Sequence, residues 1–180
     1  MAASSADSAR ALPPVTLVLG GARSGKSVFA EGLVAPHRRG CVYLATAEIL
    51  DDEMAERVRL HRARRDAAWR SLEAPLDLAP ALVAQTEQGA AVLVDCLTLW
   101  LSNLMQAGRD PAAESTALIK ALGQCGGPVV FVANEVGLGI VPDNALARAF
   151  RDHAGRMNQR IAAIADAVFF IAAGLPLRLK

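Results

Sequence analysis

The segment GGARSGKS, residues 20–27, has the spacing of a phosphate-binding loop. Gly20, Gly25, Lys26 and Ser27 satisfy the pattern G-x-x-x-x-G-K-[ST]. Glycines let backbone N–H groups curl around phosphates, the lysine can bridge the β and γ oxygens, and the serine hydroxyl can hold Mg²⁺. An apolar strand pattern precedes the segment and a helical pattern follows it, so we expect nucleotide binding rather than a chance strand-to-helix turn.

A magnesium-holding acid is expected at the end of a neighbouring apolar strand. Asp95, which closes the run AAVLVD, is the natural candidate, and its alternative role is the N-cap of a helix that starts at CLTLW. Glu135 follows the run VVFVAN, at a position where ligands bind in open α/β sheets. It could hold metal or substrate, or it could order the loop NEVGLGIVP, and residue chemistry alone leaves these alternatives open.

A single histidine, His61, stands among six arginines between residues 57 and 70. In one interpretation the segment is a solvated basic helix face, and His61 extends its apolar stripe. In the other, the arginines grip a triphosphate and His61 is a nucleophile that forms a phosphoramidate. Neighbouring arginines would stabilise charge on the phosphoryl oxygens and lower the pKa of the histidine. His37 and His153 lack such a setting, and we expect surface or packing roles for them.

Short apolar runs alternate with longer helical patterns, which is typical of an α/β fold with a parallel sheet. We predict a P-loop NTPase-type, mostly parallel sheet flanked by helices, with a short C-terminal β-hairpin. The strands are expected at residues 15–20, 41–46, 90–95 and 126–134, with two more around a Gly-Leu-Pro turn near the C-terminus. The helices are expected at residues 27–35, 50–65, 76–88, 112–123 and from about Asp143 to about Ala165.

The composition fits a single nucleotide-binding domain over residues 15–180, preceded by a flexible tail over residues 1–14. A transit peptide is the alternative for the tail, but the segment is short and contains Asp7. The net charge of +1 does not indicate a nucleic-acid partner. No apolar run reaches the roughly 18 to 20 residues that a membrane span needs. Three separate cysteines without a C-x-x-C pair favour a reducing cytoplasm.

Five segments together form a more specific pattern than the phosphate loop alone. They are GGARSGKS, YLATAEILDDEMAERVRLHRARRDAAWRSLE, VDCLTLWLSNL, NEVGLGIVPDNALARAFRDHAGRMNQRIA and GLPLRLK. From about Leu17 to Lys180 the chain resembles the bifunctional adenosylcobinamide kinase / adenosylcobinamide-phosphate guanylyltransferase family of cobalamin biosynthesis. The first segment is generic to P-loop proteins, whereas the second and the fourth are long and peculiar to this family.

The resemblance implies two reactions at one nucleotide site. The enzyme would phosphorylate the aminopropanol hydroxyl of adenosylcobinamide with ATP or GTP. It would then transfer GMP from GTP to that phosphate, which releases pyrophosphate and gives adenosylcobinamide-GDP. The second reaction in this family passes through a guanylylated histidine, and His61 is the matching residue here. The resemblance also implies a homotrimer with a site formed between subunits.

The resemblance implies a site that combines the loop, Asp95, the residues after the second strand, Glu73 and the arginine segment. Lys26 and His61 are the expected catalytic residues, and Ser27 and Asp95 the expected Mg²⁺ ligands. Glu73 could accept hydrogen bonds from guanine. The expected nucleotide-binding residues are Gly20, Gly21, Ala22, Arg23, Ser24, Gly25, Lys26, Ser27, Thr46, Ala47, Glu48, Arg62, Ala63, Arg64, Arg65, Glu73 and Asp95.

One residue departs from the pattern of the family. Asp66 stands where the family usually has proline. Its carboxylate could weaken triphosphate binding slightly, or it could pair with Arg62 or Arg70. The departure does not change the assignment.

Two other functions are compatible with the residues. A single-activity P-loop kinase would keep a structural His61 and would never form a covalent GMP adduct. A nucleotide-switched binding module would need an interaction domain or regulatory tail, and the sequence suggests neither. We also expect the helix at 50–65 to be mobile and to be ordered by nucleotide, because the loop holds the β and γ phosphates whereas His61 must reach the α-phosphorus.

Overall fold

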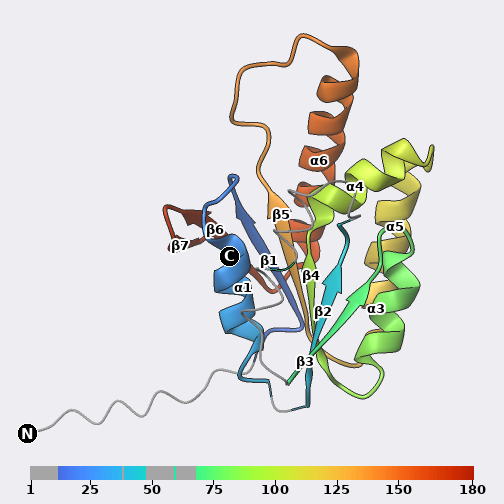
Figure 1. Cartoon of the computed structure of the whole chain (residues 1–180), viewed down its shortest axis with the longest axis vertical. Helices are drawn as coiled ribbons and strands as arrows, with labels where there is room; N and C mark the ends of the chain where they lie inside the picture. The colour runs from blue at the N-terminus through green and yellow to red at the C-terminus, as the bar shows by residue number, and fades with distance from the viewer. Residues whose placement is uncertain (1–11, 38, 48–58, 60–67) are drawn as a thin grey trace, which may run out of the picture.

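A computed structural model of the chain describes residues 12–37, 39–47, 59 and 68–180. Within these ranges the strands form one sheet, and helices lie on both of its faces (Figure 1). The strands are β1 (Val15–Gly20), β2 (Cys41–Ala45), β3 (Trp69–Glu73), β4 (Ala91–Asp95), β5 (Val129–Asn134), β6 (Ala167–Ala172) and β7 (Leu175–Arg178). The helices are α1 (Lys26–Val34), α3 (Leu78–Thr86), α4 (Leu97–Gln106), α5 (Pro111–Leu122) and α6 (Ala145–Ile164).

The sheet has the strand order β3-β2-β4-β5-β1-β6-β7. Every pair of neighbours is parallel except the last, because β6 and β7 form an antiparallel hairpin. The carboxyl ends of the parallel strands therefore meet at one edge, which is where ligands bind in open α/β sheets. The predicted α/β class, the mostly parallel sheet and the C-terminal hairpin are confirmed.

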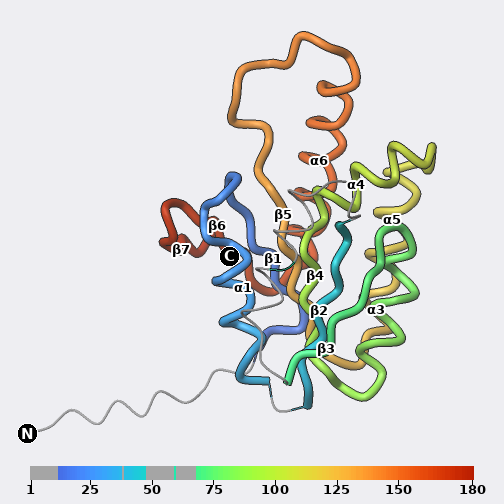
Figure 2. The backbone as a smooth tube through the Cα atoms, viewed as in Figure 1, coloured from blue at the N-terminus to red at the C-terminus, as the bar shows by residue number. Residues whose placement is uncertain are grey.

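Both faces of the sheet are buried. Helix α1 covers one face, and α3, α4, α5 and α6 cover the other (Figure 1, Figure 2). Along β1, Leu17 and Leu19 pack toward the four helices, whereas Val18 packs toward α1. Trp100 of α4 and Phe131 of β5 are fully buried in the larger cluster. Burial on both faces explains why the strands are continuous apolar runs in the sequence.

Strand β5 starts later than the sequence predicts. Its first residue is Val129 rather than Gly126. The glycines before it form a close-packed turn, since a Cβ atom at Gly127 would lie 2.1 Å from the carbonyl oxygen of Ala90. The two glycines are therefore needed for the approach to β4, and pairing with β1 begins only after them.

The hairpin turn also differs from the expected Gly-Leu-Pro turn. Ala173 and Gly174 form it, with φ angles of 51° and 80°. Leu175 and Pro176 already belong to β7, where they face Ala172 and Ile171 of β6. Two residues with positive φ are the requirement of the tight turn that matches the twist of a hairpin.

The prediction missed one strand, β3, which is the first strand in the sheet order and therefore an edge strand. Its residues are only partly buried or exposed, and it pairs with β2 alone. An edge strand with polar residues lacks the apolar run by which the other strands were predicted.

The predicted helices are confirmed where the structure describes them, with ends that differ by one or two residues, whereas α4 was expected only in the alternative in which Asp95 caps a helix. Asn144 is the N-cap of α6 in place of the predicted Asp143, and its side chain accepts a hydrogen bond from the backbone N–H of Ala147 over 2.7 Å. The predicted helix at 50–65 and its expected mobility lie outside the described residues.

The described residues begin within the predicted N-terminal tail. Leu12 packs against the α1-side cluster, which is the group of buried residues between the sheet and α1. The carbonyl oxygen of Pro14 accepts a hydrogen bond from Val129 N–H over 2.9 Å. Residues 1–11 lie outside the described ranges. None of the helices in the described part of the chain combines the length and apolarity that a membrane crossing requires.

Candidate functional site

The phosphate-binding loop connects the carboxyl end of β1 to the amino end of α1. Gly20 is the last residue of β1, and Gly25 is the N-cap of α1 with a φ of 95°. Arg23 also adopts a left-handed conformation, with a φ of 58°. This backbone shape turns N–H groups toward the amino end of a helix, which is an anion-binding arrangement.

Glycine is the only residue that fits at position 20. A Cβ atom there would lie 2.6 Å from the carbonyl oxygen of Ile171 and 2.6 Å from Ser24 Oγ. The loop is thus packed tightly between its own backbone and strand β6. This packing gives the first glycine of the motif a structural reason that is independent of the ligand.

The lysine of the motif is held at the loop. Lys26 is 8% exposed, and its Nζ donates a hydrogen bond to the carbonyl oxygen of Gly21 over 3.0 Å. The ammonium group therefore lies next to the loop backbone rather than extending into solvent. From there it can contact the β and γ oxygens of a bound triphosphate.

Asp95 lies at the end of β4, and a neighbouring strand orients its carboxylate. The phenol of Tyr43 on β2 donates a hydrogen bond to Asp95 Oδ2 over 3.1 Å. The N-cap residue of α4 is Cys96, so the helix-cap alternative for Asp95 is wrong. The half-buried carboxylate is instead positioned at the sheet edge where nucleotide is expected.

Glu73 and Asp95 flank the end of β2. Ala45 is the register partner of both residues. Residues in register point to the same face of a sheet, and Ala45 packs with the α1-side cluster. Both carboxylates therefore lie on the face that α1 covers, which is also the face of the phosphate-binding loop.

The Cys96 thiol is within electrostatic reach of both Asp95 and Lys26. Burial is the largest cause that raises its pKa from 9.0 to about 11, and the negative charge of Asp95 is the next. The positive charge of Lys26 acts in the opposite direction. Since both charges act on one thiol, the lysine of the loop and the acid of β4 belong to one electrostatic environment.

Thr46 ties the end of β2 to the start of α4. Its fully buried hydroxyl donates to the carbonyl oxygen of Cys96 over 2.7 Å and accepts from Cys96 N–H over 2.8 Å. The Asn103 side chain on α4 donates to the carbonyl oxygens of Thr46, over 2.7 Å, and Pro75, over 3.0 Å. The side chain of Thr46 therefore holds site segments together, and Ala47 follows it at the sheet edge.

The loop after β5 starts beside the phosphate-binding loop. Glu135 N–H donates to the carbonyl oxygen of Gly20 over 3.1 Å, and Glu135 Oε1 accepts from Gly137 N–H over 2.6 Å. Asn134 N–H donates to the hydroxyl of Thr98 over 2.7 Å. The loop-ordering role that was open for Glu135 is therefore present in the structure.

Sequence reasoning missed the residues that support the site. Tyr43, Thr98 and Asn103 all hydrogen-bond to site segments, and although they stand in two of the family segments, none was predicted as a site residue. Asn103 carried one signal, since it is a polar residue within the otherwise apolar stretch LTLWLSNLM. Buried polar side chains of this kind are usually hydrogen-bonded to something specific.

Several predicted site residues lie outside the described part of the chain. They are Glu48, His61, Arg62, Ala63, Arg64 and Arg65. The nearby Asp66 lies outside it as well. The other histidines are placed: His37 Nε2 is 2.9 Å from the carbonyl oxygen of Gly89, as a packing residue would be, and His153 is a partly buried residue of α6.

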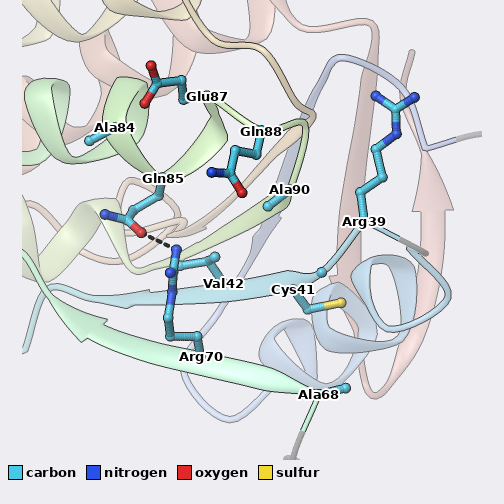
Figure 3. A pocket seen from close by; sticks show the side chains of 11 residues that line it. Arg39, Cys41, Val42, Ala68, Arg70, Ala84, Gln85, Glu87, Gln88 and Ala90 are labelled. Atoms are coloured by element: carbon cyan, nitrogen blue, oxygen red, sulfur yellow. Dashed lines mark hydrogen bonds between the residues drawn. The ribbon is translucent and has the colours of Figure 1, made fainter.

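A polar pocket of about 400 Å³ lies at the opposite edge of the sheet, where β2 and β4 begin (Figure 3). Arg70 crosses it and donates a hydrogen bond to Gln85 Oε1, whereas Arg39 points away from Arg70 (Figure 3). The two guanidinium groups do not converge on a common point. This pocket contains none of the predicted site residues.

Ser27 and Asp95 offer the oxygen atoms that Mg²⁺ prefers. One is a hydroxyl in the first turn of α1, and the other is an oriented carboxylate. Across residues 12–37, 39–47, 59 and 68–180, no group of three or more His, Cys, Asp and Glu side chains could hold a metal ion. Mg²⁺ bound with a nucleotide typically takes one or two protein ligands and completes its shell with phosphate and water, so this donor set fits it.

The loop, the parallel sheet and the acidic strand end define a P-loop nucleotide-binding protein. The flagellar accessory protein FlaH from Methanocaldococcus jannaschii has a similar structure, with a TM-score of 0.53 at 13% identity, over 94% of this chain and 80% of that one. An ATPase from the type III secretion system of pathogenic bacteria has a TM-score of 0.55 at 12% identity, over 92% and 56% of the chains. At these identities the likeness shows the fold alone.

The family is shown by sequence. The family model for cobinamide kinase / cobinamide phosphate guanyltransferase matches residues 16–179. The bifunctional adenosylcobalamin biosynthesis protein CobP of Pseudomonas aeruginosa is 49% identical, over 91% of this chain and 96% of that protein. The bifunctional protein CobU of Salmonella typhimurium is 43% identical, over 91% and 98%. The chain belongs to this family of transferases.

Proposed function

We propose that this protein catalyses two successive transfers to one corrinoid. It phosphorylates the hydroxyl of adenosylcobinamide with ATP or GTP. It then transfers GMP from GTP to the new phosphate and releases pyrophosphate, with adenosylcobinamide-GDP as the product. The observation that carries the proposal is the phosphate-binding loop, with Lys26 and the oriented Asp95, in a chain that matches the family over residues 16–179.

In this proposal, different residues of the described part of the chain bind the phosphates, the Mg²⁺ and the base. Residues 20–27 surround the phosphates, and Lys26 contacts the β and γ oxygens. Ser27 and Asp95 hold Mg²⁺, which neutralises charge on the phosphate oxygens when it is bound. Thr46 and Ala47 shape the adjoining wall, and Glu73 accepts hydrogen bonds from the guanine base.

The residues between β2 and β3 perform the second transfer. An imidazole nitrogen of His61 attacks the α-phosphorus of GTP, so that a P–N bond forms, the α–β anhydride bond breaks and pyrophosphate leaves. The phosphate of the corrinoid then attacks the same phosphorus, and the P–N bond breaks. The nucleotide is also contacted by Glu48, Arg62, Ala63, Arg64 and Arg65. The arginines stabilise the negative charge on the phosphoryl oxygens.

The test is to incubate the protein with GTP labelled at the α-phosphate, to denature it and to look for bound label. Wild type and His153→Ala are expected to retain an acid-labile, base-stable label, and His61→Ala is expected to have none. His153 lies on α6 and serves as the matched histidine control. Phosphorylation of cobinamide without any protein-bound label would contradict the guanylyl-histidine step and leave a kinase.

The assembly is proposed to be a cytoplasmic homotrimer with a site between subunits and no nucleic-acid partner. Apolar side chains on the segment between β5 and α6 support an interface, because Leu138, Ile140 and Val141 are 81%, 98% and 63% exposed. This segment projects well beyond the sheet edge (Figure 1). Light scattering is expected to give three times the chain mass for wild type and a smaller mass for Ile140→Asp, and a monomeric wild type would overturn the proposal.

A further inference from the structure

The C-terminal hairpin lies directly against the phosphate-binding loop (Figure 1). The N–H of Gly174 in the hairpin turn donates a hydrogen bond to the carbonyl oxygen of Ser24 over 2.8 Å. A Cβ atom at Gly25 would lie 3.2 Å from the Cα atom of Gly174. The backbones of the turn and of the loop are therefore in contact at two consecutive loop residues.

Side chains extend this contact from the loop to helix α1. The rings of Phe29 on α1 and Phe169 on β6 meet edge to face, with centroids 5.0 Å apart. Arg178 on β7 is the register partner of Phe169, and its Cζ lies 6.0 Å from the ring centroid. The hairpin thus holds both the loop and the helix that follows it.

The loop adopts a backbone shape that needs support. Arg23 is not glycine, yet it has a φ of 58°, a conformation that costs free energy and persists only when the surroundings impose it. Within the loop, the backbone hydrogen bond from Ser24 N–H to the carbonyl oxygen of Gly21 is long, at 3.3 Å. The shorter bond that Ser24 makes through its carbonyl oxygen is the one to Gly174.

We infer that the hairpin turn, through Gly174, is a positioning element for the nucleotide phosphates. The hydrogen bond from Gly174 fixes the orientation of the Ser24–Gly25 peptide plane, and with it the direction of Gly25 N–H, one of the backbone donors that such a loop offers to phosphate. It acts through the loop backbone and does not touch the substrate. The inference rests on the proposed nucleotide-binding function, and it predicts that the turn sets the affinity for ATP and GTP but not for the corrinoid.

Gly174→Ala tests this, with Gly108→Ala as the matched control. Both glycines have positive φ, 80° and 67°, and no atom lies within 4 Å of an added Cβ atom, so both substitutions introduce the same kind of backbone strain. Both are expected to lower Tm. Only Gly174→Ala is expected to raise the Kd of a non-hydrolysable GTP analogue, by about tenfold, and to raise the nucleotide KM with the cobinamide KM unchanged.

Two further variants keep the test independent of folding defects. Ala173→Asn places a residue that favours positive φ at the first position of the turn, so it is expected to raise Tm and to keep the wild-type Kd or tighten it. Phe169→Leu keeps an apolar, though smaller, side chain and removes the aromatic contact with Phe29. It is expected to raise the Kd of the GTP analogue by about threefold.

The outcomes separate this inference from the proposed function. A wild-type Kd in both Gly174→Ala and Phe169→Leu, with lowered Tm, would overturn the positioning role and leave the hairpin as a structural element only. If wild type itself binds no GTP analogue, the proposed nucleotide function fails instead. An equal rise in the Kd of the GTP analogue in Gly174→Ala and Gly108→Ala would also overturn the inference, because the effect would then reflect general destabilisation.

Discussion

Tyr43 on β2 donates a hydrogen bond to Asp95 Oδ2 on the neighbouring strand β4, over 3.1 Å. The contact joins a side chain that is 7% exposed to a carboxylate at the sheet edge. It limits the rotation of the carboxylate. A carboxylate oriented in this way is suited to a metal ion that also contacts phosphate.

This relationship predicts a graded loss of activity. Asp95→Asn removes the charge and is expected to lower kcat of cobinamide phosphorylation by roughly a hundredfold or more. Tyr43→Phe removes the orienting hydrogen bond but keeps the charge of Asp95, and it is expected to lower kcat about fivefold. Initial rates measured across a range of Mg²⁺ concentrations check both. Asp77→Asn is the control, since that carboxylate is 76% exposed and pairs with Arg109; an Asp95→Asn enzyme with the Mg²⁺ dependence of wild type would argue against the assignment.

Replacing the loop lysine is expected to affect triphosphate binding more than folding. Lys26→Met keeps the buried stem and removes the charge, so the Kd of a non-hydrolysable triphosphate should rise about 10- to 100-fold. Calorimetric titration measures it, with Lys120→Met, an exposed lysine of α5, as the control. An unchanged Kd in Lys26→Met would mean that the lysine is not a phosphate ligand.

Features that depend on residues close together in the sequence could be predicted, whereas contacts between distant residues could not. The loop at 20–27 and the acid of β4 were predictable because each follows an apolar strand, and local spacing determines the chemistry. Strand β3 could not be predicted in this way, because its residues are only partly buried or exposed and do not form an apolar run. The contact between Gly174 and Ser24 joins residues near opposite ends of the chain, and no local pattern indicates it.

Asn103 predicts a coupling between stability and nucleotide affinity. Its side chain bonds the carbonyl oxygens of Thr46 and Pro75, which follow β2 and β3. Asn103→Ala leaves both acceptors without this donor and is expected to lower the free energy of unfolding by about 2 to 4 kcal/mol. It should also raise the nucleotide Kd, because the wall beside the loop loses its tie to α4.

Urea unfolding and nucleotide titration measure the two effects of Asn103→Ala. Gln106→Ala is the control on the same helix, since its side chain is exposed and donates a hydrogen bond to Ser102 in its own helix. A variant that is destabilised but binds nucleotide with wild-type affinity would show that this tie serves folding alone.

The Cys96 thiol predicts a loss of stability at alkaline pH. Burial and the nearby charge of Asp95 raise its pKa from 9.0 to about 11 in the folded protein. Below pH 9.0 both the folded and the unfolded thiol keep the proton, so the contribution to stability is fully present. Between pH 9.0 and about 11 the unfolded chain releases the proton while the folded chain retains it, and the free energy of unfolding falls by up to about 3 kcal/mol.

Urea unfolding of wild type and Cys96→Ala between about pH 8 and pH 10.5 isolates this contribution from other titrating groups. The free energy of unfolding should fall less steeply with rising pH in Cys96→Ala than in wild type. Cys125→Ala is the matched comparison, because burial also raises the pKa of that thiol but its side chain is only partly buried, so the change in slope should be smaller. Parallel curves for wild type and Cys96→Ala would mean that the thiol titrates alike in the folded and unfolded chains, and that the end of β4 is open to water.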